Sequence, residues 1–119
     1  MKAIDFGEKF ELFSDTWSPK VIAEMNDYQF KLVRLQGDFV WHQHDETDEV
    51  FIVLEGEIVI DFDNGPVTLK AGQLLVVPKG VRHCPRAERE AKVLLVEPRG
   101  VVNTGDIQSQ LTARNDQWL

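Results

Sequence analysis

The chain has 119 residues, a length that suits one domain able to bury roughly two-thirds of its unfolded surface. Its formal net charge is −7, from 13 Lys and Arg against 20 Asp and Glu, which argues against nucleic acid as a partner. The single cysteine excludes an intrachain disulfide, and neither a signal-peptide core nor an apolar run of the roughly 20 residues of a membrane helix is present, so we expect a cytoplasmic protein that does not enter a membrane.

The N-terminal segment, residues 1–19, is expected to be helical from Ile4 to Phe13. Phe6, Phe10 and Phe13 are spaced as on one face of an amphipathic helix, and Pro19 lies beyond its expected end. Aromatic residues at this spacing are typical of packing, so we expect the helix to cover the body of the protein.

Residues 20–97 carry short runs with strand character, separated by turn signals such as Asn64-Gly65 and Pro78-Lys79-Gly80. A regular series of this kind predicts an all-β sandwich or barrel. The expected strands are Val21–Met25, Tyr28–Gln36, Phe39–His44, Glu49–Leu54, Glu57–Phe62, Val67–Lys70, Gln73–Val77, Arg82–Arg86 and Lys92–Val96.

Two runs, Val50–Leu54 and Lys92–Val96, are apolar on both faces. A lone barrel with a solvated outside does not require this, so we expect the N-terminal helix and a second subunit, in a homodimer, to cover the outer face. Residues 98–119 show no clear period and are expected to form a C-terminal tail that packs either on the barrel or on the partner subunit.

All three histidines lie in two short motifs, His42-Gln43-His44 and Pro78-Lys79-Gly80-Val81-Arg82-His83. His42 and His44 share one face of an expected strand, so their rings can converge on one ion. Glu49 opens the next expected strand, where an antiparallel neighbour would face the histidines, and Asp48 in the same acidic run is the alternative ligand. The sequence therefore predicts a metal site.

These residues resemble the two motifs of the cupin family. The first motif runs Gly, five residues, His-x-His, three or four residues, Glu, six residues, Gly, and the second runs Gly, five residues, Pro-x-Gly, two residues, His, three residues, Asn. Two departures are visible: four residues separate Gly37 from His42, and Ala87 stands where the second motif often has Asn. The matching residues are Gly37, His42, His44, Glu49, Gly56, Gly72, Pro78, Gly80 and His83.

The resemblance implies a double-stranded β-helix, or jelly-roll barrel, with a metal ion held by His42, His44, Glu49 and His83. Three neutral imidazoles and one carboxylate suit one divalent transition metal, and zinc, iron, manganese, nickel and copper all remain open. An octahedral ion would keep positions free for water or substrate.

Small cupins include sugar-phosphate isomerases and metal-dependent oxygenases, so the resemblance implies a metal-dependent enzyme acting on a small polar molecule. The alternative is a non-catalytic module that binds or senses a small ligand. Gln36, Trp41 and Phe51 are candidate pocket walls. Arg34 is either a clamp for an anionic substrate or a charge that faces outward or an interface.

Overall fold

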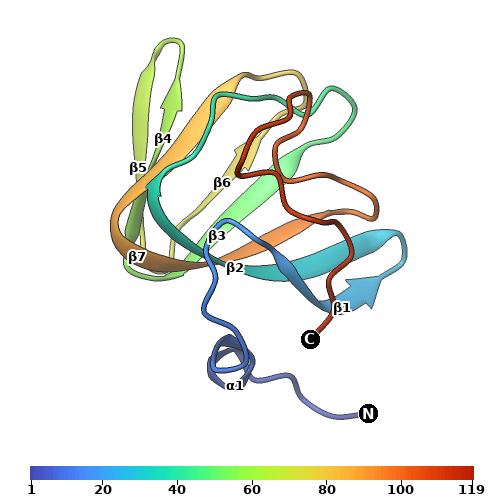
Figure 1. Ribbon diagram of the computed structural model, residues 1–119. Coiled ribbons are helices and arrows are strands. Elements are labelled where there is room, and N and C mark those ends of the chain that lie inside the picture. Colours follow the sequence, from blue (N-terminus) through green and yellow to red (C-terminus); the bar gives the residue numbers. More distant parts are fainter.

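The computed structural model describes residues 1–119 and shows an antiparallel β-barrel with one short helix (Figure 1). The all-β class expected from the sequence, with a helix near the N-terminus, is confirmed. In chain order the elements are α1 (Phe6–Phe10), β1 (Lys20–Met25), β2 (Tyr28–Asp38), β3 (Glu49–Glu55), β4 (Glu57–Phe62), β5 (Gly65–Lys70), β6 (Leu74–Val77) and β7 (His83–Pro98).

Strand β7 connects the two sides of the barrel. It pairs antiparallel with β2 along most of its 16 residues, with β4 near its start and with β3 near its end. The strand order is β1-β2-β7-β3-β6, and the hairpin of β4 and β5 is joined to the other half of β7. A register shift between Leu35 and Gly37 lies where β2 and β7 curve, as expected for a bulge that bends a strand.

Seven strands are present where nine were expected. The last two expected strands are both parts of β7, because Ala87 and Ala91 both pair with β2 and only a bulge lies between them. The expected strand Phe39–His44 is wrong: this segment, which we call the ligand loop (residues 39–44), has only an isolated bridge between His42 and His83. The histidines therefore lie beside the start of β7 and not in a hairpin with β3, which pairs with β6 and β7.

Helix α1 is shorter than the expected Ile4–Phe13. Asp5 caps its start by accepting a hydrogen bond from Glu8 N at 2.9 Å. Arg34 then donates from Nη2 to Phe10 O at 2.7 Å and from Nε to Phe13 O at 3.0 Å, so a side chain of β2 holds the carbonyls where the helix ends.

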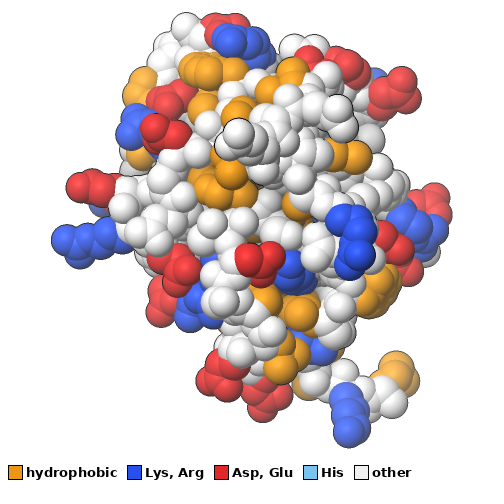
Figure 2. Space-filling view, in the orientation of Figure 1, with side chains coloured by type: hydrophobic (Ala, Val, Ile, Leu, Met, Phe, Trp, Pro, Cys, Tyr) orange, Lys and Arg blue, Asp and Glu red, His pale blue; other side chains and the backbone are white.

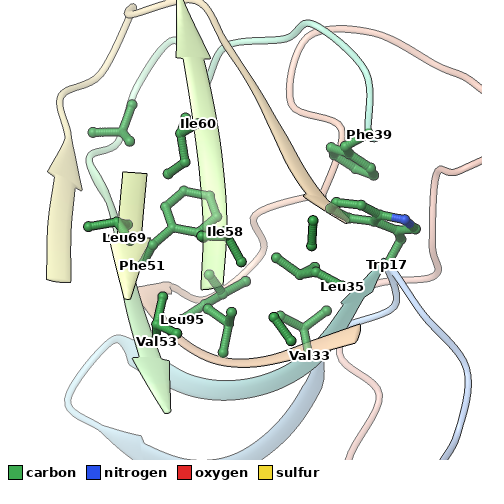
Figure 3. Packing of buried hydrophobic residues seen from close by; sticks show 14 residues of the cluster. Trp17, Val33, Leu35, Phe39, Phe51, Val53, Ile58, Ile60, Leu69 and Leu95 are labelled. Carbon is green, nitrogen blue, oxygen red and sulfur yellow. The ribbon is translucent and has the colours of Figure 1, made fainter. Parts of the chain in front are cut away.

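The interior of the barrel is apolar over most of its length (Figure 3). Alternate residues of each strand point inward, so burial of their side chains stabilises the fold by about 1.5–3 kcal/mol each. Trp17 and Phe39 stack at one side of this cluster with ring centroids 4.6 Å apart. The buried cluster consists of Trp17, Val33, Leu35, Phe39, Phe51, Val53, Ile58, Ile60, Leu69, Val77, Ala87, Ala91, Val93 and Leu95.

Residues 98–119, the C-terminal segment, run across one open end of the barrel in Figure 1. Their end is fastened to β1 by hydrogen bonds from Val21 N to Gln117 O and from Leu119 N to Val21 O. Asn103 Nδ2 donates to Trp17 O at 2.8 Å. The segment thus contacts the barrel of its own chain. No helix in the structure has the length and apolarity needed to cross a bilayer.

Candidate metal centre

Four buried side chains converge inside the barrel beneath the C-terminal segment: His42, His44, Glu49 and His83, which we call the ligand cluster. One potential ligand atom from each lies within 4.8 Å of those of the other three. Atoms that share an ion at about 2.1 Å lie roughly 3 to 4 Å apart, so small movements of the side chains would close the cluster around a metal. The cluster is therefore able to hold a metal ion.

Backbone carbonyls orient two of the imidazoles. His42 Nδ1 lies 2.9 Å from Val40 O, and His83 Nδ1 lies 2.9 Å from Val81 O. A carbonyl can only accept, so each Nδ1 carries the proton and the lone pair of each Nε2 is left free. A metal-bound imidazole usually donates a hydrogen bond from the ring nitrogen that does not bind the metal. The Nδ1 hydrogen bonds therefore leave Nε2 as the ligand atom of both residues.

The other two side chains show an incomplete set of hydrogen bonds that a metal would complete. His44 Nε2 is buried without a hydrogen-bond partner, although it lies 3.3 Å from Glu49 Oε1. The same Glu49 oxygen lies 3.3 Å from His83 Nε2. Buried polar atoms are almost always paired, so an orphaned nitrogen beside a shared carboxylate oxygen fits a missing cation.

The electrostatics of the cluster favour a cation. Burial, followed by repulsion from His83, lowers the pKa of His42 to about 4. Burial alone would raise the pKa of Glu49, yet its contacts with His44 and His83 hold the pKa below its usual range. Burial lowers the pKa of His44, but the Glu49 carboxylate outweighs burial and leaves it raised. A neutral His42 and an ionised Glu49 are thus in the forms that bind metal.

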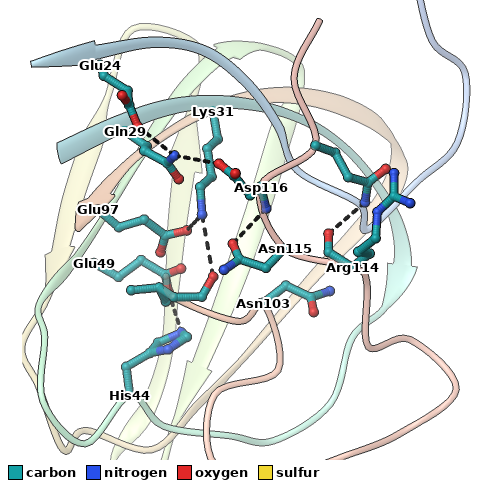
Figure 4. A network of polar contacts seen from close by, with 12 residues as sticks. Glu24, Gln29, Lys31, His44, Glu49, Glu97, Asn103, Arg114, Asn115 and Asp116 are labelled. Carbon is teal, nitrogen blue, oxygen red and sulfur yellow. Dashed lines mark hydrogen bonds and ion pairs between the residues drawn. The ribbon is translucent and has the colours of Figure 1, made fainter. Parts of the chain in front are cut away.

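A second buried carboxyl lies next to Glu49 (Figure 4). Glu97, 2% exposed, accepts a hydrogen bond at Oε1 from Lys31 Nζ at 2.9 Å, while its Oε2 has no partner. Burial and the negative charge of Glu49 raise the pKa of Glu97 to about 7, against the opposing effect of Lys31. The interior of the barrel therefore holds a buried contact between Lys31 and Glu97 beside the ligand cluster.

The C-terminal segment clamps the peptide between the two ligands of the ligand loop. Asp106 N donates to Gln43 O at 3.1 Å, and Asp106 Oδ1 accepts from Gln43 N at 3.0 Å. Gly105, with φ of +59°, approaches Gln43 closely. A Cβ on this residue would collide with Gln43 O and lie 3.2 Å from His42 Cδ2. Only glycine permits this approach.

A small cavity of about 30 Å³ adjoins the cluster, with His42 and Glu49 in its wall. The remaining wall is mostly apolar, and Asn103 of the C-terminal segment contributes to it. Its lining comprises Trp17, Pro19, Val33, Leu35, Phe39, His42, Glu49, Phe51, Pro85, Leu95 and Asn103.

Of the four candidate pocket residues, the structure places only Phe51 in the cavity wall. Gln36 is exposed, because it lies on the face of β2 opposite to the inward-facing Val33 and Leu35. Trp41 is also exposed and stacks against the Arg82 guanidinium at 4.4 Å. The side chain of Arg34 points out of the barrel, where it contacts the end of α1 and pairs with Glu90 at 3.0 Å. It therefore does not face the cavity.

Asp48, the alternative to Glu49 as a ligand, lies outside the cluster and accepts from Lys79 N at 2.9 Å. Sequence reasoning missed Trp17, Asn103 and Gly105, which reach the site from irregular segments at opposite ends of the chain. No periodic pattern marks such residues. Sequence reasoning also missed Glu97, which follows an apolar run. A carboxylate in such a position indicates that a group able to pair with it lies nearby in the fold.

A sequence model described as the Cupin domain matches residues 31–97 of the chain. The chain belongs to the cupin family. This cupin is 58% identical to a cupin-2 domain protein from Shewanella frigidimarina, with a TM-score of 0.80 over 81% of this chain and 94% of the other. It is 34% identical to NMB1881 from Neisseria meningitidis, with a TM-score of 0.75 over 82% and 99% of the two chains.

Uncharacterized protein YdbB of Bacillus subtilis is 44% identical to the cupin over 77 residues, which span 64% of this chain and 68% of that protein. Together with the solved structures, this confirms the cupin barrel expected from the two motifs.

On the surface seen in Figure 2, acidic and basic side chains are interspersed, and no histidine patch is visible. This agrees with the burial of all three histidines, which are 0–7% exposed.

Proposed function

We propose that this cupin binds one divalent transition metal through His42, His44, Glu49 and His83 and is an enzyme of the isomerase or oxygenase type acting on a small molecule. The observation that carries the proposal is the convergence of four buried ligand atoms beside a small cavity that shares two of their side chains. An ion with four protein ligands and an open coordination position could bind a substrate atom from the side of this cavity.

The metal, when bound, would polarise a substrate oxygen as a Lewis acid, and a redox-active ion would also support oxygenase chemistry. The residues of the chain have separate tasks. The Nδ1 hydrogen bonds of His42 and His83 fix the direction of their rings. The apolar wall around Phe51 excludes water and thereby strengthens the electrostatic effect of any charge in the cavity.

Elemental analysis of protein purified without a nickel column tests the metal claim. We expect about one divalent ion per chain in the natural protein and in a control with exposed Asp45→Asn, and almost none in His42→Ala or His83→Ala. Stoichiometric metal that survives both alanine substitutions would contradict the proposal. For the reaction, metal-loaded protein is assayed for oxygen consumption with phenolic compounds and for isomerisation of sugar phosphates.

The alternative is a module that binds or senses a small ligand without chemistry. One observation favours it: the cavity wall offers no acid or base other than the proposed ligands His42 and Glu49. Saturable binding of a ligand that the metal-loaded protein leaves unchanged, with no turnover in either assay, would decide for the module.

The proposal includes a homodimer formed through the outer face of the sheet. Rows of apolar side chains cross this face, because Val50 pairs with Val76 and Val96 while Ile52 pairs with Leu74 and Leu94. Leu74 and Val76 are 58% and 47% exposed, and α1 packs beside Leu94 at the other end of a row. A contiguous exposed apolar face of this kind marks an interface.

Light scattering tests the dimer. We expect Val76→Lys to yield a monomer, because a lysine would bury its charge in the contact, whereas Val67→Lys on β5, away from this face, leaves a dimer. A natural protein that is monomeric contradicts this part of the proposal. A location in the cytoplasm also belongs to the proposal, supported by the one free cysteine, Cys84, which is buried.

A further inference from the structure

Two hollows adjoin the ligand cluster, and they differ in polarity. The small cavity of about 30 Å³ shares His42 and Glu49 with the cluster and has a mostly apolar wall. A second, larger pocket of about 360 Å³ lies between residues 44–47 and residues 99–106 of the C-terminal segment. Of the four proposed ligands, only His44 lines this second pocket, which we call the acidic pocket.

The lining of the acidic pocket carries an excess of negative charge. Asp45, Glu46 and Asp106 are exposed in it, and Arg99 is its one basic residue. Arg99 Nε lies 2.9 Å from Glu24 Oε2, outside the lining, so a sixth group already balances its charge. Three carboxylates thus have no counter-charge in the pocket, and such a concentration of one sign attracts ions of the opposite sign from solution.

Glu46 differs from the other two carboxylates of the pocket. Asp45 Oδ1 accepts from Gln43 Nε2 at 2.6 Å, and Asp106 Oδ1 accepts from Gln43 N at 3.0 Å. The side chain of Glu46 is exposed and has neither a hydrogen bond nor an ion pair. Both of its oxygens are therefore free to take the place of water on a hydrated divalent ion.

His44 connects the acidic pocket to the ligand cluster. It is 7% exposed, and its Nε2 is buried without a hydrogen-bond partner. This nitrogen lies 3.3 Å from Glu49 Oε1, and the two side chains point toward each other in Figure 4. The same oxygen lies 3.3 Å from His83 Nε2. An ion that passes from the pocket to His44 therefore meets an unpartnered ligand atom, and the next ligands lie beside it.

The small cavity offers no comparable route to the cluster. A divalent ion holds its water strongly, and the apolar part of the cavity wall supplies no group to replace that water. In the acidic pocket, by contrast, carboxylate oxygens and then the His44 nitrogen can replace the water molecules in turn.

We propose that the acidic pocket is the entrance through which a divalent ion reaches the ligand cluster, with Glu46 as the carboxylate that first holds the ion and His44 as the first of the four ligands to bind it. The inference rests on the proposed function, because it concerns how the metal of that site arrives. It assigns Glu46 a role in the rate of metal binding and no place among the final ligands.

The rate of metal uptake tests the entrance. Metal-free protein is mixed with Co²⁺ at about 0.1 M salt, where the Debye length is about 10 Å, and quenching of tryptophan fluorescence reports the bound ion. His42→Ala supplies the background. We expect Glu46→Lys to slow association about 3- to 10-fold, because it places a positive charge at the entrance. At about 1 M salt, this difference should shrink to within about 2-fold.

Glu57→Lys is the matched control, because it makes the same change in net charge at another exposed carboxylate. Glu57 begins β4, and Phe62 at the other end of β4 pairs with His83, so Glu57 lies about 17 Å along the strand from the cluster. At this distance the charge is largely screened, and association should stay within about 2-fold of that of the natural protein. Equal slowing by the two lysines would assign the effect to net charge and overturn the inference.

A cysteine in place of Glu46 separates the effect of charge from that of shape. Glu46→Cys is modified with two methanethiosulfonate reagents of similar size, one ending in a sulfonate and the other in a trimethylammonium group. The natural Cys84 is buried and is not expected to react. The trimethylammonium form should bind Co²⁺ about 3- to 10-fold more slowly than the sulfonate form. Equal rates would overturn the inference.

Release of the metal and total metal content distinguish this inference from the proposed function. We expect Glu46→Lys to bind metal to the same stoichiometry and to release it into excess chelator within about 3-fold of the natural rate, because a rim charge acts mainly on association. Faster release with unchanged uptake would make Glu46 a ligand and overturn its role at the entrance. Natural protein whose metal uptake does not depend on the charge at Glu46 overturns this inference alone, whereas natural protein that binds no metal overturns the proposed function and the entrance with it.

Discussion

Two ligands of the cluster come from strands and two from a loop, and the two pairs are held in different ways. Glu49 begins β3 and His83 begins β7, so the ladder hydrogen bonds of the barrel fix their backbones. His42 and His44 lie in the ligand loop, whose backbone is held by single contacts: a bridge between His42 and His83, and a bond from Gly80 N to His44 O.

The loop pair depends on the C-terminal segment, and the strand pair does not. Between His42 and His44, the peptide of Gln43 is held from its other side by Asp106 and by the close approach of Gly105. The strands of the barrel alone therefore provide half of the site. The difference predicts that changes far along the chain alter metal binding through the loop pair, while the fold remains intact.

Removal of a ligand has the largest expected effect and distinguishes the pairs by stability. His83→Ala and His44→Ala should each lower metal affinity by more than about 100-fold, beyond the usual effect of residues that only support ligands. His83 is 0% exposed and meets the Phe51 ring, so its loss should also destabilise the metal-free protein by about 2 kcal/mol, more than the loss of His44, which is 7% exposed. Chelator competition and urea unfolding measure the two effects, and equal stabilities of the two variants would contradict the comparison.

Acidification of the metal-free protein should act through the loop pair. The pKa of His42 is lowered from 6.5 to about 4. Between these values the unfolded chain binds a proton that folded His42 does not, so the contribution of His42 to the free energy of unfolding falls as the pH falls from about 6.5 to about 4, by at most about 3 kcal/mol. Glu97, whose pKa is raised from 4.5 to about 7, contributes in the opposite direction as the pH falls through that range. The raised pKa of His44 also acts oppositely to that of His42: its contribution is present below about 6.5 and is lost as the pH rises through its folded pKa.

Urea unfolding across this pH range measures the effect. His42→Gln, which carries no titrating group, should remove the contribution of His42 and make the protein relatively more stable toward the acid end of this range. Unchanged pH dependence in that variant would assign the effect to other groups.

Gly105→Ala should weaken metal binding without removing a ligand. The new Cβ would push Gln43 away and disturb both neighbouring histidines, so we expect a loss of about 10- to 100-fold in metal affinity. Gly100→Ala is the matched control: its φ is +93°, but its Cβ would meet nothing within 4 Å. Chelator competition on both variants separates backbone strain from displacement of the loop, and similar losses would point to strain alone.

Asp106 is expected to have the smallest effect and to reveal what the clamp requires. Asp106→Ala removes the acceptor for Gln43 N and should lower metal affinity by up to about 10-fold. Asp106→Asn keeps an oxygen in the same place and should restore most of it. If Asp106→Asn binds metal as weakly as Asp106→Ala, the charge of Asp106, and not its hydrogen bond, supports the site.

The parts of the fold with a local pattern were predictable from the sequence. Alternating or continuous apolar runs marked β1 to β6, because each run buries at least one face. The continuity of β7 was not predictable, since Glu88-Arg89-Glu90 looks like a turn but lies in an exposed stretch of a paired strand. Helix α1 is also shorter than the spacing of its aromatic residues predicts. Arg34, distant in sequence, donates hydrogen bonds to the carbonyls where the helix ends.

The ligand cluster was predictable for a different reason than the cavity. Histidine is rare in this chain, and its spacing with Glu49 carries chemical information that does not depend on the exact strand pairing. Which of the two alternating faces of a strand looks inward depends on its tertiary pairing, and in β2 the inward face carries Val33 and Leu35 and not Gln36. Trp17 and Asn103 were out of reach because tertiary contacts alone bring their irregular segments together.

Strand β7 also governs when the molecule can be completed during synthesis. It is the last strand to leave the ribosome, yet β2, β3 and β4 all take it as a neighbour. Until then these three strands have unpaired edges that can attract other chains. Closure of the barrel brings His83 to the other ligands, and the C-terminal segment that follows β7 then holds the loop pair, so the strand edges are paired before the metal site is complete.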